Sequence, residues 1–546
     1  MSKNRQNKYM PLIMAVCVVV GILIGTFYAN HFSGNRLSII NSSSNKINNL
    51  LHIIDDQYVD TVNVNQLVEK AMPQILAELD PHSVYISAQD VQAANDDLKG
   101  SFSGVGIEFT IRQDTIRVQN VIGNGPAERA GLIAGDKIVS VDGKPFVGKE
   151  VTNQEAMRRL KGPKDTKVKL GIIRYGEKKV KEFTVTRGEI PQKSITSTYM
   201  IDDETGYIKV KNFGENTYPE LLIALAKLSQ EGVENLVIDL RGNLGGYLAS
   251  AVQMANEFLP KGRLIVYTQG RKSPRQEYRS DGRGSYQHIP LVVLIDEASA
   301  SSSEIFAGAM QDNDRATIIG RRSFGKGLVQ QPMPFNDGSM IRLTIARYYT
   351  PSGRCIQKPY TAGDNVDYEE DLLARYQHGE FFSQDSIRHS GKAYHTSIGR
   401  VVYGGGGITP DIFVPEDTTN VTSYYKEASM SGLILQFAFN YTDSNRQKMN
   451  EFTDMKELSA YLVKQNTVEK FAEFANKNGL KRRNLMIKKS HKLLERYINS
   501  RIIYNMLNDE AWTQYLNQDD PAIAKTLDVF RRKAAFPKKE SSQNNL

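Results

Sequence analysis

The chain has 546 residues, of which 69 are lysine or arginine and 61 are aspartate or glutamate, giving a formal net charge of +8. A chain of this length is too long for one hydrophobic core and predicts roughly three or four folded units. The positive charge is spread along the sequence, so nucleic acid is a poor candidate partner. Of the two cysteines, Cys17 lies in an apolar run and Cys355 has no metal-ligand pattern around it.

The N-terminal residues 10–29 carry no charge and are largely apolar. At a rise of about 1.5 Å per residue, a helix of this length crosses the hydrocarbon core of a bilayer. Three basic residues precede it, which places the N-terminus in the cytoplasm and the chain after residue 30 outside: Lys3, Arg5 and Lys8. A cleaved signal peptide is the alternative, but no clean small-residue cleavage site is present. We therefore expect an uncleaved, single-pass anchor in the inner membrane, with the rest of the chain in the periplasm.

After a polar linker at residues 41–45, apolar residues recur at helical spacing: Ile47, Leu50, Leu51, Ile54 and Tyr58. This pattern predicts a helical region within residues 31–99. It leads to the segment 80–85, Asp-Pro-His-Ser-Val-Tyr. His82 is far in sequence from the serines described below, so we do not expect it to act as a catalytic base.

Residues 100–109 are rich in glycine and lead into alternating strands, and residues 125–143 hold a second glycine-rich motif. A Gly-x-Gly-hydrophobic loop can capture a chain terminus, because its amides bind a carboxylate while the peptide adds as an extra strand. A plain glycine-rich hairpin is the alternative. Together the two motifs resemble a PDZ domain, which we place at residues 100–187. The resemblance implies that four loop residues bind a peptide carboxylate: Gly104, Val105, Gly106 and Ile107.

An apolar strand is predicted at residues 235–239, and the segment 239–246 has the sequence Asp-Leu-Arg-Gly-Asn-Leu-Gly-Gly. Paired glycines after a strand are usually only a turn. They also allow a backbone amide to face a substrate carbonyl, because no Cβ stands in the way. The segment is therefore a candidate oxyanion hole.

A second strand is predicted at residues 291–296, followed by small and hydroxylated residues and a helix that begins near Glu304. Such a unit exposes a side chain at the helix N-terminus, where free amides and the helix dipole favour an oxyanion. One serine would serve as the N-cap. The cluster holds more hydroxyls than one cap requires: Ser299, Ser301, Ser302 and Ser303.

Lys326 lies between Gly325 and Gly327, and no histidine separates it from the serine cluster. A serine hydroxyl needs a neutral base to accept its proton. Burial lowers the pKa of a lysine because it disfavours the charged form. The pattern thus predicts a serine nucleophile paired with Lys326, although a surface lysine in a turn is the simpler interpretation of Gly-Lys-Gly.

Two other motifs overlap Lys326. The first is a phosphate-binding loop over residues 320–326, but residue 327 is glycine rather than serine or threonine, and residues 328–332 favour a strand over the required helix. The second is a Ser-x-x-Lys motif that begins at Ser323. The glycines around Lys326 disfavour the helical turn that this motif requires.

Over about residues 50–415 the chain resembles the carboxyl-terminal processing peptidases, or tail-specific proteases, which are serine proteases with a Ser-Lys pair. The resemblance is carried by residues 299–312 and 318–330. It implies a role for each matching residue: Ser301 as nucleophile, Lys326 as general base, Gln330 orienting the lysine amine, Asp312 supporting the site, and the amides of Gly246 and Ser302 forming the oxyanion hole. Leu244 and Ser302 depart from the family pattern, so Ser299 and Ser303 stay open as alternative nucleophiles.

The implied fold class is α/β, with a crotonase-like mixed α/β protease core over residues 188–423, an inserted PDZ domain, and helical N- and C-terminal regions. Residues 361–403 interrupt the family pattern and are long for a bare loop. They are expected to cover the active-site entrance, to bind a partner, or to play no catalytic part. Their histidines lack metal-like spacing and are expected at the surface: His378, His389 and His395. Apolar helical faces in residues 424–546 predict a dimer interface or a cap on the core.

Taken together, the sequence predicts a membrane-anchored serine endopeptidase that engages protein C-termini through its PDZ domain and needs no metal or cofactor. Movement of the PDZ domain is expected to gate the Ser-Lys-Gln site. Two alternatives stay open, a noncatalytic tail-binding adaptor or scaffold and a hydrolase of nonpeptide esters or amides on the same fold. The sequence leaves the natural substrates, a homodimer and an adaptor partner undecided.

Overall fold

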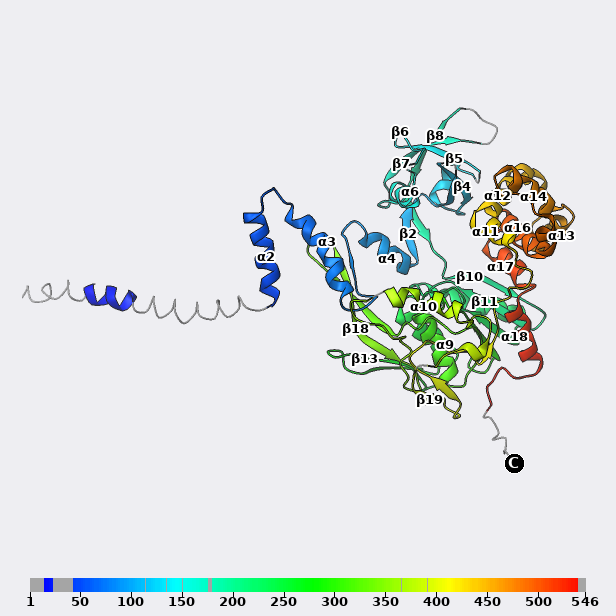
Figure 1. Ribbon diagram of the computed structural model, residues 1–546. Coiled ribbons are helices and arrows are strands. Elements are labelled where there is room, and N and C mark those ends of the chain that lie inside the picture. The colour runs from blue at the N-terminus through cyan, green and yellow to red at the C-terminus, as the bar shows by residue number, and fades with distance from the viewer. Residues whose placement is uncertain are drawn as a thin grey trace, which may run out of the picture. The chain divides into compact units, whose positions relative to one another are not determined.

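The structure is a computed structural model that describes residues 14–22 and 43–538, except for 113, 134, 150, 175–178, 365 and 390 (Figure 1). The chain divides into two compact units, residues 1–78 and 79–546.

The described part of the first unit is helical. Residues 14–22 form a helix, α2 spans Ser43–Gln57 and α3 spans Val64–Ala77. The side chain of Asn63 caps α3 by accepting a hydrogen bond from the Gln66 amide at 3.2 Å. The membrane anchor predicted over residues 10–29 falls mostly outside the described residues. Among the helices that the structure does describe, none is both long and apolar enough to cross a bilayer.

A six-stranded sheet forms the centre of the second unit, in the order β10-β11-β12-β15-β16-β21. Strand β10 is antiparallel to β11, and the other neighbours are parallel. The strands span Ile195–Met200, Thr205–Val210, Asn235–Asp239, Leu291–Ile295, Thr317–Gly320 and Ile412–Phe413.

The two faces of this sheet are covered by different helices, because successive side chains of a strand point to opposite faces. Ile238 and Val293 belong to a core shared with α7, α8 and α9. Val237 and Val292 belong to a second core that includes residues of α18. The three helices of the first core span Thr217–Gln230, Leu248–Asn256 and Ser302–Asp312. A parallel sheet covered on both faces is the mixed α/β core predicted from the sequence.

A second, antiparallel sheet lies in the same unit and has the order β1-β18-β13-β14, with β17 also paired to β18. These strands span Val84–Ile86, Met340–Tyr349, Leu264–Gln269, Gln276–Arg279 and Leu328–Pro334. Strand β1 carries the end of the segment 80–85 into this sheet, where Tyr85 pairs with Ile341. Residues before the PDZ domain therefore reach the same sheet as β17, the strand that follows Lys326.

The PDZ region contains a sheet of order β3-β4-β5-β7-β8, with β6 paired to β5, and its own apolar core. The strands span Ile107–Arg112, Thr115–Val121, Lys137–Val141, Lys167–Ile173, Lys181–Thr186 and, for β6, Lys144–Pro145. Helices α5 (Pro126–Arg129) and α6 (Asn153–Leu160) accompany them. The region is preceded by α4 (Val91–Lys99) and joined to the core through the paired strands β2 (Ser101–Gly104) and β9 (Gly188–Pro191).

The insertion at residues 361–403 folds into the helix α10 (Val366–Gln377), a short 3₁₀ helix (Gln384–Ser386) and the hairpin β19–β20 (Ala393–His395 and Val401–Tyr403). Its three histidines are exposed, as predicted: His378, His389 and His395.

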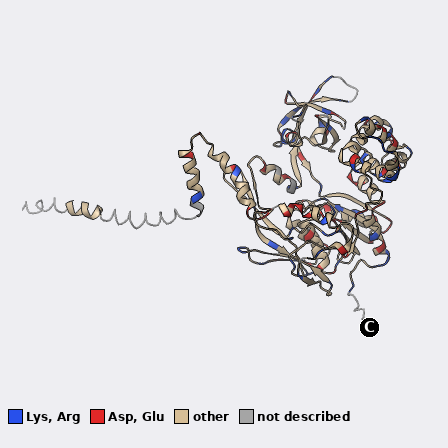
Figure 2. Ribbon diagram, in the orientation of Figure 1, with Lys and Arg blue, Asp and Glu red and all other residues tan. Residues whose placement is uncertain are grey.

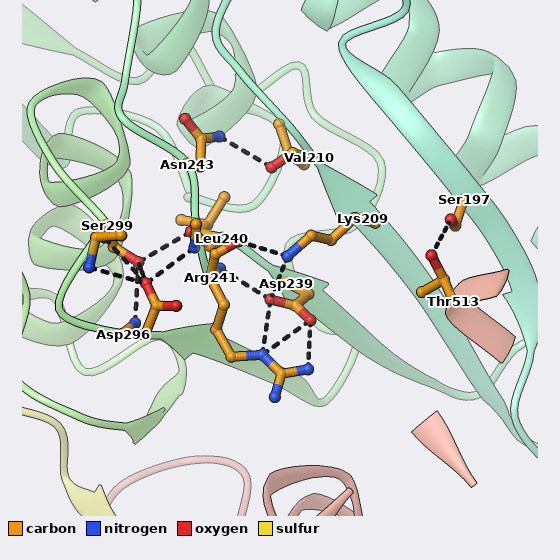
Figure 3. Close-up of polar contacts among 12 residues, drawn as sticks. Ser197, Lys209, Val210, Asp239, Leu240, Arg241, Asn243, Asp296, Ser299 and Thr513 are labelled. Carbon is orange, nitrogen blue, oxygen red and sulfur yellow. Dashed lines mark hydrogen bonds and ion pairs between the residues drawn. The ribbon is translucent and has the colours of Figure 1, made fainter. Parts of the chain in front are cut away.

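Eight helices follow in the described C-terminal region: Ser423–Met430, Leu433–Met449, Met455–Val463, Thr467–Lys477, Asn484–Lys489, His491–Met506, Asp509–Asn517 and Pro521–Arg531, labelled α11 to α18. Helix α17 is hydrogen-bonded to the edge strand β10, because Ser197 Oγ donates to Thr513 Oγ1 at 2.9 Å (Figure 3). Helix α18 packs on the sheet as described above. These two helices cap the core, one of the two roles expected for the region.

Basic and acidic residues are mixed along the described elements (Figure 2).

Candidate active site

Ser301 occupies the turn between β15 and α9 and is the N-cap residue of that helix. Its backbone φ is +54°, a conformation that residues with a Cβ rarely adopt, so the surrounding structure must hold it there. Ser301, Lys326 and Gln330 line one cavity of about 610 Å³. The fold thus brings the three residues proposed for catalysis to a single opening.

The hydroxyls of the other serines in the cluster hold the loop 240–246 in place. Ser299 Oγ donates to Leu240 O, Ser302 Oγ to Gly246 O and Ser303 Oγ to Asn243 O, each at 2.9 Å. Ser299 and Ser303 are fully buried. These two alternative nucleophiles are therefore structural, and their bonds explain why the cluster has more hydroxyls than a helix cap needs.

Two glycines allow the loop 240–246 to lie directly against Ser301. A Cβ on Gly245 would come within 2.7 Å of Ser301 Cβ, and one on Gly246 within 2.2 Å of Phe213 O. Both lie in the cavity wall beside Ser302. The amides of Gly246 and Ser302 have no hydrogen-bond partner among the residues that the structure describes. They are therefore available to stabilise an oxyanion.

Asp239 holds the start of this loop through a buried charge cluster (Figure 3). Its carboxylate accepts hydrogen bonds from Lys209 Nζ at 3.1 Å and from Arg241 Nη2 at 2.6 Å. Burial opposes ionisation of Asp239, but the charges of Arg241 and Lys209 outweigh it and hold the pKa of this carboxyl below its ordinary value. Arg241 Nη1 also donates to Asp520, the N-cap residue of α18, at 2.7 Å. The candidate oxyanion loop is thus bonded to the C-terminal helices.

Lys326 lies in the loop between β16 and β17, and its Nζ donates to Gln330 Oε1 at 3.2 Å. Burial lowers the pKa of Lys326, and the positive charge of Arg342 lowers it further, against the opposing charges of Glu304 and Asp80. This is the direction that a general base requires, because only the neutral amine can accept a proton.

Glu304 joins the serine and lysine parts of the site. It is fully buried on α9, and one carboxylate oxygen accepts the amides of Ser301 at 2.8 Å and Lys326 at 2.9 Å. The other oxygen accepts Ser323 Oγ at 2.5 Å and the Gly325 amide at 2.7 Å. Burial raises the pKa of Glu304 to about 7, although all of these donors favour the charged form. Sequence reasoning assigned this residue only to a helix start, whereas the spacing Ser301-x-x-Glu304 is a capping-box signal that could have identified it.

Tyr348 makes a second connection between the two parts. Its buried hydroxyl lies 3.1 Å from Ser301 O and donates to Lys326 O. Burial raises the pKa of Tyr348, which stays a protonated donor at neutral pH. No sequence signal singles it out, because it is one of two adjacent tyrosines at the end of β18.

His82 lies near Lys326, to which it is linked through Gln330, and no local sequence pattern predicts this position. Asp80 Oδ1 accepts the His82 amide at 2.9 Å and so shapes the turn. The His82 carbonyl in turn accepts a hydrogen bond from Gln330 Nε2. Burial lowers the pKa of the His82 ring to about 4, helped by the charge of Lys326. The imidazole is therefore neutral at physiological pH.

The remaining candidate residue lies away from the cavity. Asp312 is at the opposite end of α9 from Ser301, where it pairs with the buried Arg354 at 2.8 Å and accepts the Ser352 hydroxyl at 2.7 Å. It supports the chain that follows β18 rather than the lysine.

Neither of the motifs that overlap Lys326 is formed. The residues after the lysine form the strand β17, so no helix is present to hold a phosphate. Ser323 is buried, and its hydroxyl donates to Glu304 rather than facing Lys326. Across the described residues, no cluster of His, Cys, Asp or Glu could hold a metal ion.

The four PDZ residues lead from Gly104, the last residue of β2, to Ile107, the first residue of the edge strand β3. Gly106 has a φ of +81°, and its carbonyl accepts the Ile122 amide at 3.0 Å. Val105 is buried in the PDZ core. Among the described residues, β3 is an edge strand of its sheet. Its outer edge can therefore receive an added peptide strand.

Family models match three parts of the chain. Peptidase family S41 matches residues 204–366, the PDZ domain matches residues 95–173, and a family of unknown function matches residues 424–508.

Individual relatives extend these matches. A carboxy-terminal-processing protease of Bartonella bacilliformis is 39% identical over 327 residues, which cover 59% of this chain and 74% of the relative. The carboxy-terminal processing protease CtpB of Bacillus subtilis is 35% identical over 57% of this chain and 65% of the relative. A solved photosystem II D1 C-terminal processing protease is 27% identical, covers 67% of this chain and 91% of its own, and has a TM-score of 0.35.

The peptidase core, the PDZ domain and these relatives define a serine-type endopeptidase. The chain belongs to the carboxy-terminal processing protease family.

Proposed function

We propose that this peptidase cleaves proteins near C-termini held by its PDZ domain, with Ser301 as nucleophile and Lys326 as general base. One observation carries the assignment. The buried Glu304 carboxylate accepts the backbone amides of both Ser301 and Lys326, at 2.8 and 2.9 Å, beside the cavity that both residues line. A single group therefore fixes the separation between nucleophile and base.

The chemistry follows from this placement. Ser301 Oγ attacks the scissile carbonyl while Lys326 Nζ takes its proton, and the ammonium then protonates the leaving amine. The amides of Gly246 and Ser302 stabilise the oxyanion. Water, activated by the same lysine, hydrolyses the acyl-enzyme. Gln330 Oε1 accepts one N–H of the lysine and so fixes the position of the amine.

The PDZ domain supplies the preference for tails in this proposal. The loop of Gly104, Val105, Gly106 and Ile107 would bind the terminal carboxylate, while the tail adds to the edge of β3. The names of the relatives favour the same substrate class. Movement of the PDZ domain would gate the Ser-Lys-Gln site.

We further propose that residues 10–29 anchor the enzyme in the inner membrane with its catalytic core in the periplasm. The support is the uncharged segment that follows Lys3, Arg5 and Lys8. Membrane fractionation and protease accessibility in intact spheroplasts test this. Release of the core with the soluble periplasmic fraction would contradict the anchor.

The catalytic assignment is tested with the purified full chain in detergent micelles and an unfolded reporter with an apolar C-terminal tail. Ser301→Ala and Lys326→Ala should each abolish cleavage, whereas the exposed controls Ser444→Ala and Lys477→Ala should leave it unchanged. Amidation of the reporter tail should reduce cleavage if the PDZ loop reads the carboxylate.

Each alternative predicts a different result in this assay. Retained cleavage in Ser301→Ala would refute the nucleophile. Tail binding without cleavage by the unmodified chain would favour the adaptor. Turnover of small esters but not of the reporter would favour a nonpeptide hydrolase.

A further inference from the structure

The insertion at residues 361–403 packs against the loop that carries Lys326. Arg375 of α10 donates to Arg322 O at 2.6 Å and to Ser323 O at 3.1 Å. Its side chain is buried. The segment that interrupts the family pattern therefore forms part of the support behind the lysine loop.

Tyr368, also on α10, contacts three residues near the lysine loop. Its ring packs edge-on against Phe324, with the centroids 5.9 Å apart. Gln357 Nε2 donates to its hydroxyl at 3.4 Å, and Gln357 Oε1 accepts the Gly327 amide at 2.7 Å. The hydroxyl also forms a 2.7 Å hydrogen bond with His82 Nε2. Because the hydroxyl oxygen accepts from Gln357, its own proton is free for His82.

Tyr368 is linked to Lys326 through His82 and Gln330. The ring of His82 bonds Tyr368, and the backbone carbonyl of the same residue bonds Gln330. The His82 carbonyl accepts from Gln330 Nε2, and Gln330 Oε1 accepts from Lys326 Nζ at 3.2 Å. One end of an amide side chain donates and the other accepts, so the His82 carbonyl decides which end faces Lys326. If Gln330 turned over, its NH₂ group would face the lysine N–H groups and the lysine would lose its acceptor.

We propose that Tyr368 is a positioning residue for the general base, acting through His82 and Gln330 on Lys326. The inference rests on the proposed function, since it assumes that Lys326 is the base. It gives the insertion a defined part in catalysis: α10 holds the turn at His82, and the turn holds the amide that positions the lysine amine.

The test compares Tyr368→Phe with Tyr376→Phe in the full chain. Both substitutions remove one hydroxyl from α10, but Tyr376 is 41% exposed and packs on Phe381 and Phe382. Tyr368→Phe should lower kcat about tenfold and change KM less than about twofold, because Tyr368 does not line the cavity that Ser301 and Lys326 share. Tyr376→Phe should match the unmodified enzyme. Melting temperatures of both variants identify any loss of folding.

A double-mutant cycle separates positioning from general support. In a Gln330→Ala background, Tyr368→Phe should have almost no further effect on kcat, because the bond through which it acts is already absent. The same fold-loss in both backgrounds, or no loss in Tyr368→Phe alone, would overturn the proposal. The proposed function fails by a different result, namely cleavage that survives in Ser301→Ala.

Discussion

The serine side of the active site and the lysine side are held in different ways. Around Ser301, the hydroxyls of Ser299, Ser302 and Ser303 donate hydrogen bonds to the loop 240–246, and all of these residues lie in α9 or in the connections that follow β12 and β15 of the central sheet. Around Lys326, the supports come from distant parts of the chain. His82 precedes the PDZ domain, and α10 belongs to the insertion.

This difference indicates which substitutions should change stability and which should change rate. The proposed nucleophile and oxyanion amides are fixed by short hydrogen bonds inside one buried core, so changing their supports costs stability. The proposed base depends on hydrogen bonds between segments that are far apart in sequence, so its geometry can change while the core stays intact. Substitutions of the supporting residues on the serine side should therefore mainly lower stability, and those of the supporting residues on the lysine side should mainly lower rate.

The largest effect is expected for Glu304→Gln, because Glu304 belongs to both sides. The amide keeps the size of the carboxylate but turns an NH₂ group toward backbone N–H donors. Activity should fall about 100-fold or more and stability by about 3 kcal/mol. Reporter cleavage and urea unfolding measure the two losses. A variant that keeps its activity would show that the two sides are positioned independently.

The pH profile of kcat/KM tests the lysine side, because it reports the protonation of Lys326. Lys326 must be neutral to act, and its pKa is lowered by burial and by Arg342, so activity should rise with pH through that lowered value. Arg342→Gln removes a neighbouring positive charge, which favours the ammonium and raises the pKa of Lys326. The rise should move to higher pH, with a loss of about three- to tenfold at pH 7 that is recovered at alkaline pH. A uniform loss at every pH would assign Arg342 to substrate binding instead.

Ser303→Ala tests the serine side. It removes one of two hydrogen bonds to the buried Asn243 carbonyl, the other coming from the Ala300 amide at 3.0 Å. The free energy of unfolding should fall by about 1 kcal/mol, with at most a severalfold change in kcat. Denaturant titration against the exposed control Ser444→Ala measures it. A large loss of rate without a loss of stability would contradict the contrast between the two sides.

The smallest effect is expected for Asp520→Asn, which weakens the ion pair between Arg241 and α18. Asparagine caps a helix as well as aspartate does, so the substitution leaves the N-cap intact. Because the pair is partly exposed, it should contribute about 0.5–1 kcal/mol at low salt and less at high salt. Urea unfolding at two salt concentrations tests this. A loss that is independent of salt would indicate a packing role instead.

The parts of the fold that the sequence predicted are those with local signals. Apolar runs predicted β12 and β15, glycine spacing predicted the PDZ loop, and the Ser301 and Lys326 motifs predicted the site. The resemblance added Gln330. What sequence reasoning missed are the side chains that connect these motifs, such as Tyr348 and His82. Their roles depend on which strands pair across long sequence separations, and no local pattern records that pairing.

Asp312 shows the opposite limitation. A family motif marks the position, but only the fold shows that its charge faces Arg354 at the far end of α9. The insertion is a third case, because the sequence left three roles open for it: covering the active-site entrance, binding a partner, or no catalytic part. The structure shows instead that Tyr368 and Arg375 are buried against the lysine loop.

The position of α18 has a consequence for how the protein is made. Ile523 and Phe530 of this helix complete the core on one face of the central sheet, together with Val237 and Val292. During translation, that face therefore stays uncovered until more than 520 residues have been synthesised. The candidate oxyanion loop, which is bonded to Asp520, is completed only then. A ribosome-bound chain would thus carry an unfinished active site, and truncation before α18 should leave an apolar face that favours aggregation.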